Sequence, residues 1–444
     1  MDLCAQPHGP LTGDIEVPGD KSISHRALLF ASLAAGTSRV RGLLEGEDVR
    51  ASEQALRALG VPIERTADGA VLVHGVGVGG FAEPETVLDL GNAGTGARLL
   101  MGLLAGCPFT SFLTGDASLR RRPMGRVAEP LRRMGASIVA RSGDRLPLAI
   151  TGRAVLAPLA WQTPVASAQV KSAILLAALA APGRTEVIEP MASRDHSERM
   201  LKAMGARIES ERLGDGRHRV TIVGQEELAP FALEVPGDPS SAAFPLVAAA
   251  VTPGSQLTIR SVGLNPLRTG LLETLREMGA EIAVENLHER GGEPVGDLRV
   301  RAARLRGVEV PAERAPRMID EYPILSVAAA CAEGRSVMRG LAELRVKESD
   351  RLAAIASGLE ACGVRAEVEG DDLVVEGCGG PPPGGGAIDA RLDHRIAMTF
   401  AILGGVARRP VVVRGAETIA TSFPGFVELM DRIGAAIAVT GEGS

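Results

Sequence analysis

The sequence predicts a mixed α/β (α+β) protein in which one unit is repeated six times and the repeats are grouped in two domains of three. The main observation is a phrase, written LRALGVPIE in its first copy and LREMGAEIAV in its fourth, that ends a helix at a glycine and continues as a strand. Glycine suits the left-handed position that follows a helix, and regular recurrence is typical of repeat architectures. The repeated glycines, spaced 70 to 84 residues apart, are Gly60, Gly135, Gly205, Gly279, Gly363 and Gly434.

Each copy of the phrase closes the second helix of a unit that runs helix, strand, helix, strand, strand. The two closing strands are missing after the sixth copy, so we expect the N-terminal stretch LTGDIEVPG, which begins at Leu11, to supply the missing strand. The first helices of the six units are expected at residues 27–35, 97–105, 173–181, 242–251, 324–332 and 396–406.

A second phrase marks where the chain passes between the domains. VPGDKS begins at Val17 and VPGDPS at Val235, each just before the first helix of a set of three repeats. We therefore predict a middle domain of residues 20–236 and a discontinuous domain made of residues 237–444 plus 1–19.

Composition argues against several classes of function. A formal net charge of -6 and an aromatic content of 2% argue against sequence-independent binding of nucleic acid. The five cysteines lack zinc or redox spacing and the seven histidines form no helical metal pair, so no metal site and no cofactor is expected. The first residues do not read as a leader, and apolar runs fall short of the roughly 18 residues of a membrane span, so we expect a cytoplasmic protein.

Basic residues recur at the predicted starts of helices, where they are mildly unfavourable unless an anion binds. Ordinary capping residues and solvated arginines explain any one of these clusters taken singly. Their recurrence at equivalent repeat positions favours a ligand with two separate anionic groups, held where the helix starts of the two domains converge. The residues are Lys21, Arg26, Arg98, Arg122, Lys171, Lys347, Arg351 and Arg395.

Nine segments make the chain resemble the 5-enolpyruvylshikimate-3-phosphate (EPSP) synthase family over nearly its whole length. The SAQ and RDH spellings are similar to those of the class II bacterial branch. The resemblance implies six βαβαββ units in two three-unit domains that close on substrate, and we expect a monomer. The segments are PGDKSISHR, GNAGTG, RPMGRV, SAQVKSA, PGDPSSAAFP, IDEYPIL, RVKESDR, DHRIAM and ATSFPGF.

The resemblance implies two small-molecule substrates, shikimate 3-phosphate and phosphoenolpyruvate, and it implies their binding residues motif by motif. Arg26 and Arg194 suit the phosphate of the first substrate, and guanidinium forks suit the carboxylate and phosphate of the second. The shikimate 3-phosphate set is Lys21, Ser22, Arg26, Ser167, Ala168, Gln169, Arg194, Asp320 and Lys347. The phosphoenolpyruvate set is Lys21, Gly94, Arg122, Gln169, Arg351 and Arg395.

The resemblance also implies addition followed by elimination, without a covalent enzyme nucleophile. Asp320 would accept the proton of the attacking hydroxyl, and either Lys21 or Glu348 would protonate the methylene carbon of phosphoenolpyruvate. The sequence leaves both donors open. Glyphosate is expected to occupy the phosphoenolpyruvate site, where Gly94 leaves room for it.

Two positions differ from another branch of the family. Thr421 stands where that branch has a lysine, and His196 stands where it has a tyrosine, so we do not assign either residue to the site.

Two other functions stay open as alternatives. A related transferase acts on UDP-N-acetylglucosamine and normally carries a cysteine before its RP motif, where this chain has GDASLRRRP. A non-catalytic repeat scaffold that binds anions would have no use for Asp320 and Glu348.

Overall fold

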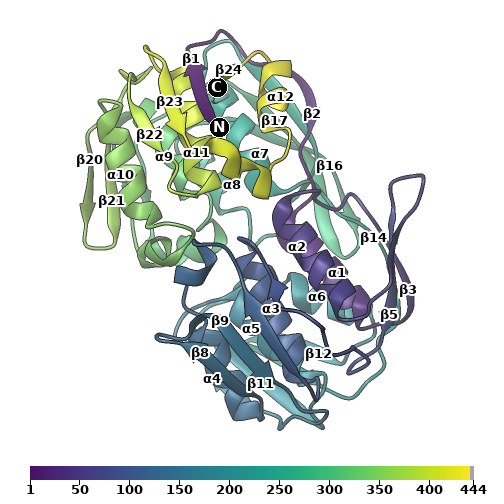
Figure 1. The fold of residues 1–444 in the computed structure, drawn as a ribbon. Coiled ribbons are helices and arrows are strands. Elements are labelled where there is room, and N and C mark those ends of the chain that lie inside the picture. Colours follow the sequence, from purple (N-terminus) through teal and green to yellow (C-terminus); the bar gives the residue numbers. More distant parts are fainter. Residues whose placement is uncertain (441–444) are drawn as a thin grey trace. The chain divides into compact units, whose positions relative to one another are not determined.

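The computed structural model describes residues 1–440, and the chain divides into two compact units (Figure 1). The middle unit comprises Gly19–Val235 together with Glu289–Glu293. The terminal unit comprises Met1–Pro18, Pro236–His288 and the chain from Pro294 onward. The six four-stranded sheets include β14-β3-β5-β4, β6-β7-β9-β8 and β10-β11-β13-β12 from the strands of the middle repeats. The other three are β16-β17-β15-β2, β18-β19-β21-β20 and β22-β23-β1-β24.

The middle unit contains the first three repeats. Their helices are α1 (Lys21–Ser32), α2 (Glu47–Ala58), α3 (Gly94–Ala105), α4 (Gly125–Met134), α5 (Ala168–Ala178), α6 (His196–Ala203) and the short 3₁₀ turn η1 (Leu119–Arg121). Their strands are β3 (Ala35–Arg41), β4 (Ile63–Arg65), β5 (Val71–Val76), β6 (Leu88–Asp89), β7 (Thr110–Thr114), β8 (Ser137–Arg141), β9 (Arg145–Thr151), β10 (Ala160–Gln162), β11 (Arg184–Glu189), β12 (Ile208–Arg212), β13 (His218–Val223) and β14 (Ala232–Glu234).

The terminal unit contains the other three repeats and both N-terminal strands, apart from Glu289–Glu293 at the turn between β16 and β17, which belong to the middle unit. Its helices are α7 (Pro239–Val251), α8 (Gly270–Glu277), α9 (Tyr322–Cys331), α10 (Arg351–Ala361), α11 (His394–Val406) and α12 (Phe426–Arg432), with the 3₁₀ turns η2 (Ala312–Arg317), η3 (Ala342–Val346) and η4 (Ala416–Thr421). Its strands are β1 (Asp2–Gln6), β2 (Thr12–Glu16), β15 (Gln256–Gly263), β16 (Glu281–Arg290), β17 (Glu293–Arg301), β18 (Glu309–Val310), β19 (Glu333–Met338), β20 (Ala366–Glu369), β21 (Asp372–Cys378), β22 (Ala387–Asp389), β23 (Val411–Arg414) and β24 (Ala436–Thr440).

The first helix of each repeat is mostly apolar and mostly buried because it runs through the core of its unit. Helix α11 is buried along its whole length, and α7 and α9 are buried almost throughout. A helix of this kind is stabilised by tertiary packing rather than by one amphipathic face. Each unit has its own continuous hydrophobic core.

The glycines of the repeated phrase occupy the conformation that the sequence predicts. All six, from Gly60 with φ 83° to Gly434 with φ 104°, lie in the left-handed region. An alanine there would be strained, so the phrase keeps glycine at each helix end. The repeat count and the fold class are confirmed.

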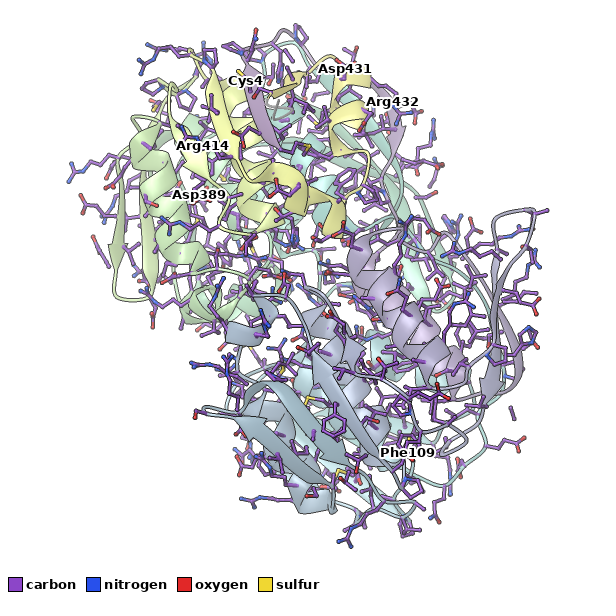
Figure 2. The ribbon with its side chains drawn as sticks, viewed as in Figure 1. Cys4, Phe109, Asp389, Arg414, Asp431 and Arg432 are labelled. Carbon is purple, nitrogen blue, oxygen red and sulfur yellow. The ribbon has the colours of Figure 1, made fainter. Side chains whose placement is uncertain are left out.

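The N-terminal strands close the repeats differently from the prediction. Strand β1 completes the sixth sheet, where it pairs antiparallel with both β23 and β24. In Figure 1 the purple β1 lies beside yellow β23, and Figure 2 labels Cys4 on β1. The stretch from Leu11 instead forms β2, which pairs in parallel with β15 of the fourth repeat. The expectation that this stretch supplies the missing sixth-repeat strand is therefore wrong, because β1 takes that place.

Two edge strands are exchanged between repeats. Strand β2 precedes α1 but joins the sheet of the fourth repeat, whereas β14 precedes α7 but pairs in parallel with β3 of the first repeat. The chain changes unit immediately after each of these strands, between Pro18 and Gly19 and between Val235 and Pro236. Both changes fall within the VPGD phrases.

Deleting residues 1–9 should destabilise the protein strongly, because it removes a central strand and the fully buried side chains of Leu3 and Ala5. Loss of one buried leucine alone typically costs ~2–5 kcal/mol, so we expect the unfolding midpoint to fall by about 10 °C or more. Deleting residues 1–17 should be at least as severe.

Thermal unfolding of both truncations measures this, with Gln6→Ala as the control because Gln6 is exposed on the same strand. Unchanged unfolding of the longer truncation would contradict closure by the N-terminus. A midpoint that falls only when residues 10–17 are also removed would assign the closing role to β2.

Candidate functional site

The predicted site residues of the middle unit gather at the starts of its first helices. Helix α1 is capped by Asp20, whose carboxylate accepts a hydrogen bond from the backbone of Ile23 at 2.8 Å. Lys21 follows directly and its ammonium lies 2.9 Å from Asp48 at the start of α2. This ion pair is mostly buried, with side-chain exposures of 15% and 6%, so it fixes the position of Lys21.

Arg26 is held rigidly one turn further along α1. Its guanidinium donates to the hydroxyls of Ser197 at 2.8 Å and Ser172 at 2.9 Å, and to the carbonyl of Ser22 at 2.9 Å. Its exposure is 2%. Arg26 therefore links helices α1, α5 and α6.

His25 is buried beside the positive charges of Lys21 and Arg26. Burial, together with these two charges, lowers its pKa to about 3, so the ring is neutral near pH 7. Its Nδ1 lies 2.9 Å from the hydroxyl of Ser52, so the neutral ring has a polar partner.

The glycine loop before α3 packs against two arginines. A Cβ atom added to Gly94 would lie 2.6 Å from Nη1 of Arg122 and 3.0 Å from Nη1 of Arg98. Arg122 is oriented by the side chain and the carbonyl of Asn92, at 2.5 and 3.4 Å. Arg98 orients Gln169 at 3.0 Å. The structure thus brings Gly94, Arg122 and Gln169 together.

The start of α5 supplies the remaining predicted residues of this unit except Arg194. Ser167 caps the helix, Ala168 is its first residue, and Gln169 also donates to Thr95 at 2.8 Å. Arg194 precedes α6 and is half-buried.

Lys171 is an exception to the expectation that basic residues at helix starts serve a ligand. Its side chain is fully buried and lies 3.1 Å from Glu189 and 2.6 Å from Glu198. Burial opposes its charge, but the two carboxylates outweigh burial and raise its pKa. For Lys171 that expectation is wrong, because its charge is neutralised inside the protein.

Arg351 organises the predicted site residues of the terminal unit. It starts α10, is 1% exposed, and lies 2.8 Å from Asp393, 2.5 Å from Glu348 and 3.2 Å from Asp320. Burial opposes its charge, but Asp393, Glu348 and Asp320 outweigh burial and raise its pKa. The guanidinium therefore stays charged and holds three carboxylates in place.

Asp320 is the point at which the remaining residues meet. Its Oδ1 lies 3.2 Å from the ammonium of Lys347 and its carbonyl accepts a hydrogen bond from Arg395 at 3.0 Å. Arg395 also lies 3.7 Å from the buried carboxylate of Glu321. The carboxylate of Asp320 is partly exposed, at 13% of its side chain, whereas Asp393 is fully buried. Of these two carboxylates, only that of Asp320 reaches the surface.

Helix α11 is positioned by a parallel strand pair. Asp389 and Arg414, labelled in Figure 2, are register partners at the carboxyl ends of β22 and β23. The helix begins five residues after Asp389 and is capped by Asp393, which accepts a hydrogen bond from the backbone of Arg395 at 3.0 Å. One aspartate thus caps α11 and anchors Arg351.

The two positions that depart from the other branch have partners inside the protein. His196 is 2% exposed and its Nδ1 lies 2.7 Å from Glu293. Thr421 is buried and donates to the carbonyl of Thr418 at 2.7 Å.

Among residues 1–440, one group of three or more His, Cys, Asp or Glu residues has possible metal-ligand atoms that all lie within 4.8 Å of one another. This group consists of Asp195, His196 and Glu293. Arg199 lies 2.9 Å from Asp195, and Nδ1 of His196 lies 2.7 Å from Glu293, so all three residues already have partners inside the protein.

Sequence reasoning did not assign several residues that position the others. Asp48 holds Lys21, Asn92 holds Arg122, and Asp393 holds Arg351. Asp393 does have a local signal, because an aspartate before an apolar helix is a common cap. Asp48 and Asn92 have none, since their partners are distant in sequence.

Six such repeats form the fold that solved enolpyruvyl transferases share. The enolpyruvyl transferase NikO from Streptomyces tendae shares the fold at a TM-score of 0.76 and 19% identity, with 98% of each chain covered. EPSP synthase from Acinetobacter baumannii matches at a TM-score of 0.86 and 45% identity, over 99% of this chain and 100% of that chain.

A family profile described as EPSP synthase (3-phosphoshikimate 1-carboxyvinyltransferase) matches residues 5–430. Proteins named 3-phosphoshikimate 1-carboxyvinyltransferase are 58% identical in Parvibaculum lavamentivorans and 59% identical in Rhodospirillum rubrum. The matches cover 98% and 97% of this chain and 96% of each relative. The chain belongs to the EPSP synthase family, which confirms the resemblance seen in its motifs. Over the described residues, no helix has both the length and the apolarity that crossing a membrane requires.

Proposed function

We propose that the enzyme transfers the enolpyruvyl group of phosphoenolpyruvate to the 5-hydroxyl of shikimate 3-phosphate and releases phosphate. The observation that carries this proposal is the cluster around Asp320, in which a partly exposed carboxylate touches Lys347 and the buried Arg351. Such a carboxylate is fixed in position and can still reach a substrate hydroxyl. A scaffold that only bound anions would gain nothing from it.

The middle unit mainly binds shikimate 3-phosphate in this proposal. Ser22, Ser167 and Gln169 present hydroxyl and amide groups near the starts of α1 and α5, and the N-termini of helices favour anions. Arg194 suits the phosphate as a bidentate donor. Arg26 already makes three internal hydrogen bonds, which supports a role in which it also orders the helix starts around the ligand.

For phosphoenolpyruvate we carry over the residues that the family resemblance implies. Arg122 and Gln169 of the middle unit, with Lys21, and Arg351 and Arg395 of the terminal unit would neutralise its carboxylate and phosphate. Planar guanidinium groups match both anions. The fixed partners of these arginines reduce the reorganisation needed on binding.

Addition followed by elimination is the chemistry that the family resemblance implies. The 5-hydroxyl oxygen attacks C2 of phosphoenolpyruvate, Asp320 takes the hydroxyl proton, and C3 receives a proton from Lys21 or Glu348. Loss of a C3 proton and cleavage of the bond between C2 and the phosphate oxygen complete the reaction. Asp48 accompanies Lys21 and Arg351 accompanies Glu348, so each proposed donor has a charged partner.

Phosphate release is the direct test. We expect release only when phosphoenolpyruvate and shikimate 3-phosphate are both present, and none when UDP-N-acetylglucosamine replaces the latter. Release with the nucleotide sugar would favour the related transferase. Absence of release with either acceptor would favour the non-catalytic scaffold.

We also propose that the enzyme acts as a monomer in the cytoplasm. Light scattering of the purified protein tests the first part, and a mass of twice 46.0 kDa would contradict it.

A further inference from the structure

We propose that Glu189, together with Lys171, is a positioning residue that locks the two segments expected to hold shikimate 3-phosphate. The inference rests on the proposed function, because that function assigns Ser167 and Arg194 to this substrate. Glu189 ends strand β11 and is fully buried, as is Lys171 on α5. Neither side chain can touch a ligand itself.

Glu189 ties the two segments together through its two carboxylate oxygens. Oε1 accepts a hydrogen bond from the backbone nitrogen of Ser167 at 2.8 Å. Oε2 accepts one from the hydroxyl of Ser193 at 2.8 Å. One carboxylate therefore bridges the cap of α5 and the residue before Arg194, which are 26 positions apart in the sequence.

Lys171 fixes the same carboxylate and the same segment. Its ammonium lies 3.1 Å from Oε2 of Glu189 and 2.6 Å from Glu198, and it donates to the carbonyl of Ser193 at 3.2 Å. These three partners match its three N–H groups. Ser193 is consequently held at both its hydroxyl and its carbonyl, which restrains the neighbouring Arg194.

Two serine hydroxyls, adjacent in sequence to Lys171 and Glu198, connect α5 and α6 to Arg26. Ser172 and Ser197 lie 2.6 Å apart, and Arg26 donates to both of them. Ser172 also donates to the carbonyl of Ala168 at 2.5 Å. The starts of α1, α5 and α6 are thus joined by buried polar contacts, which is the arrangement that a preorganised anion site requires.

The isosteric change Glu189→Gln should weaken substrate binding selectively. The backbone N–H of Ser167 can only donate, so it demands the amide oxygen, and the amide NH₂ then faces Lys171 and Ser193. The ammonium of Lys171 has no acceptor, so two donors would face each other there in a fully buried site, whereas the hydroxyl of Ser193 can turn and accept. We expect the Kd and KM for shikimate 3-phosphate to rise roughly tenfold or more, with the KM for phosphoenolpyruvate within about twofold of the parent.

The matched control is Glu186→Gln. Glu186 lies on the same strand, and its side chain pairs at the surface with Arg184 at 2.9 Å. The change removes the same charge from the same strand without affecting Ser167 or Ser193. We expect the binding of shikimate 3-phosphate to this variant to equal that of the parent.

The triple variant Lys171→Met/Glu189→Met/Glu198→Met separates positioning from stability. Glu198 is included because it pairs with Lys171 and would otherwise be left as an unpaired buried carboxylate. Replacing a whole buried ion-pair cluster by apolar side chains is often neutral or stabilising, so this variant should fold. If Glu189 and Lys171 position the segments, this variant unfolds at a midpoint close to that of the parent, while its Kd for shikimate 3-phosphate stays raised. If their role is only structural, the Kd recovers together with the midpoint, and the inference fails.

Titration calorimetry with shikimate 3-phosphate alone, alongside phosphate-release kinetics, distinguishes this failure from that of the proposed function. A parent enzyme that binds and turns over normally, with a Glu189→Gln variant that does the same, overturns the inference alone. A parent that neither binds shikimate 3-phosphate nor releases phosphate overturns the proposed function, and the positioning role falls with it.

Discussion

Asp320→Asn is expected to lower turnover by about 10²- to 10⁴-fold while shikimate 3-phosphate still binds measurably. The amide keeps the shape of the carboxylate but cannot accept the hydroxyl proton. The side chain lies 3.2 Å from both Lys347 and Arg351, and an amide oxygen can keep one hydrogen bond to these donors. Arg351 retains Asp393 and Glu348 as partners, so the cluster should persist.

Steady-state phosphate release and calorimetric binding measure the two effects separately. Asp371→Asn is the control, because Asp371 pairs with Arg345 at 3.1 Å in an exposed position of the same unit. It should leave turnover unchanged. If Asp320→Asn retains turnover within about tenfold of the parent, Asp320 is not the base. Equal losses of binding and turnover would instead indicate that the cluster collapsed.

The architecture could be predicted because its signals are local. Each repeat contains a glycine at a helix end, followed by a strand, and this local pattern predicts a positive φ at the glycine. All six glycines have that conformation. No such local pattern indicates whether β1 or β2 closes the sheet of the sixth repeat. Both are short segments before α1, and their partners lie more than 240 positions away in the sequence. Strand pairing at that separation depends on tertiary packing, which spacing alone does not specify.

Reasoning from charge alone selects candidate site residues only at the starts of helices, whereas the motif resemblance supplied others, such as Gln169, Arg194 and Asp320. A cation at a helix N-terminus is expected to bind an anionic ligand, and this criterion also predicted Lys171 as a site residue. Its partners, however, are Glu189 and Glu198 inside the fold. The sequence around Lys171 gives no sign of these carboxylates, since they come from the next strand and helix. The same limit applies to Asp48 beside Lys21.

Gly94→Ala is expected to weaken glyphosate more than phosphoenolpyruvate, and the structure adds a physical route for this effect. The resemblance to the family places glyphosate in the phosphoenolpyruvate site. A methyl at Gly94 would lie 2.6 Å from Nη1 of Arg122, closer than side-chain contacts allow. The guanidinium is the far end of a flexible side chain, so we expect Arg122 to shift rather than the helix to unfold.

The displaced guanidinium would affect both ligands, but unequally. Phosphoenolpyruvate is the smaller ligand and can follow a shift of a few tenths of an ångström, whereas the inhibitor also loses the space that the methyl fills. Overpacking typically costs ~1–3 kcal/mol, so we expect the inhibition constant to rise by roughly 5- to 150-fold and the KM for phosphoenolpyruvate to rise less. Gly91→Ala is a useful comparison, because no atom lies within 4 Å of a Cβ there although its φ of 52° adds backbone strain. Measuring both constants for the parent and the two variants tests the prediction, since equal changes in the two constants would show that Gly94 does not discriminate between substrate and inhibitor.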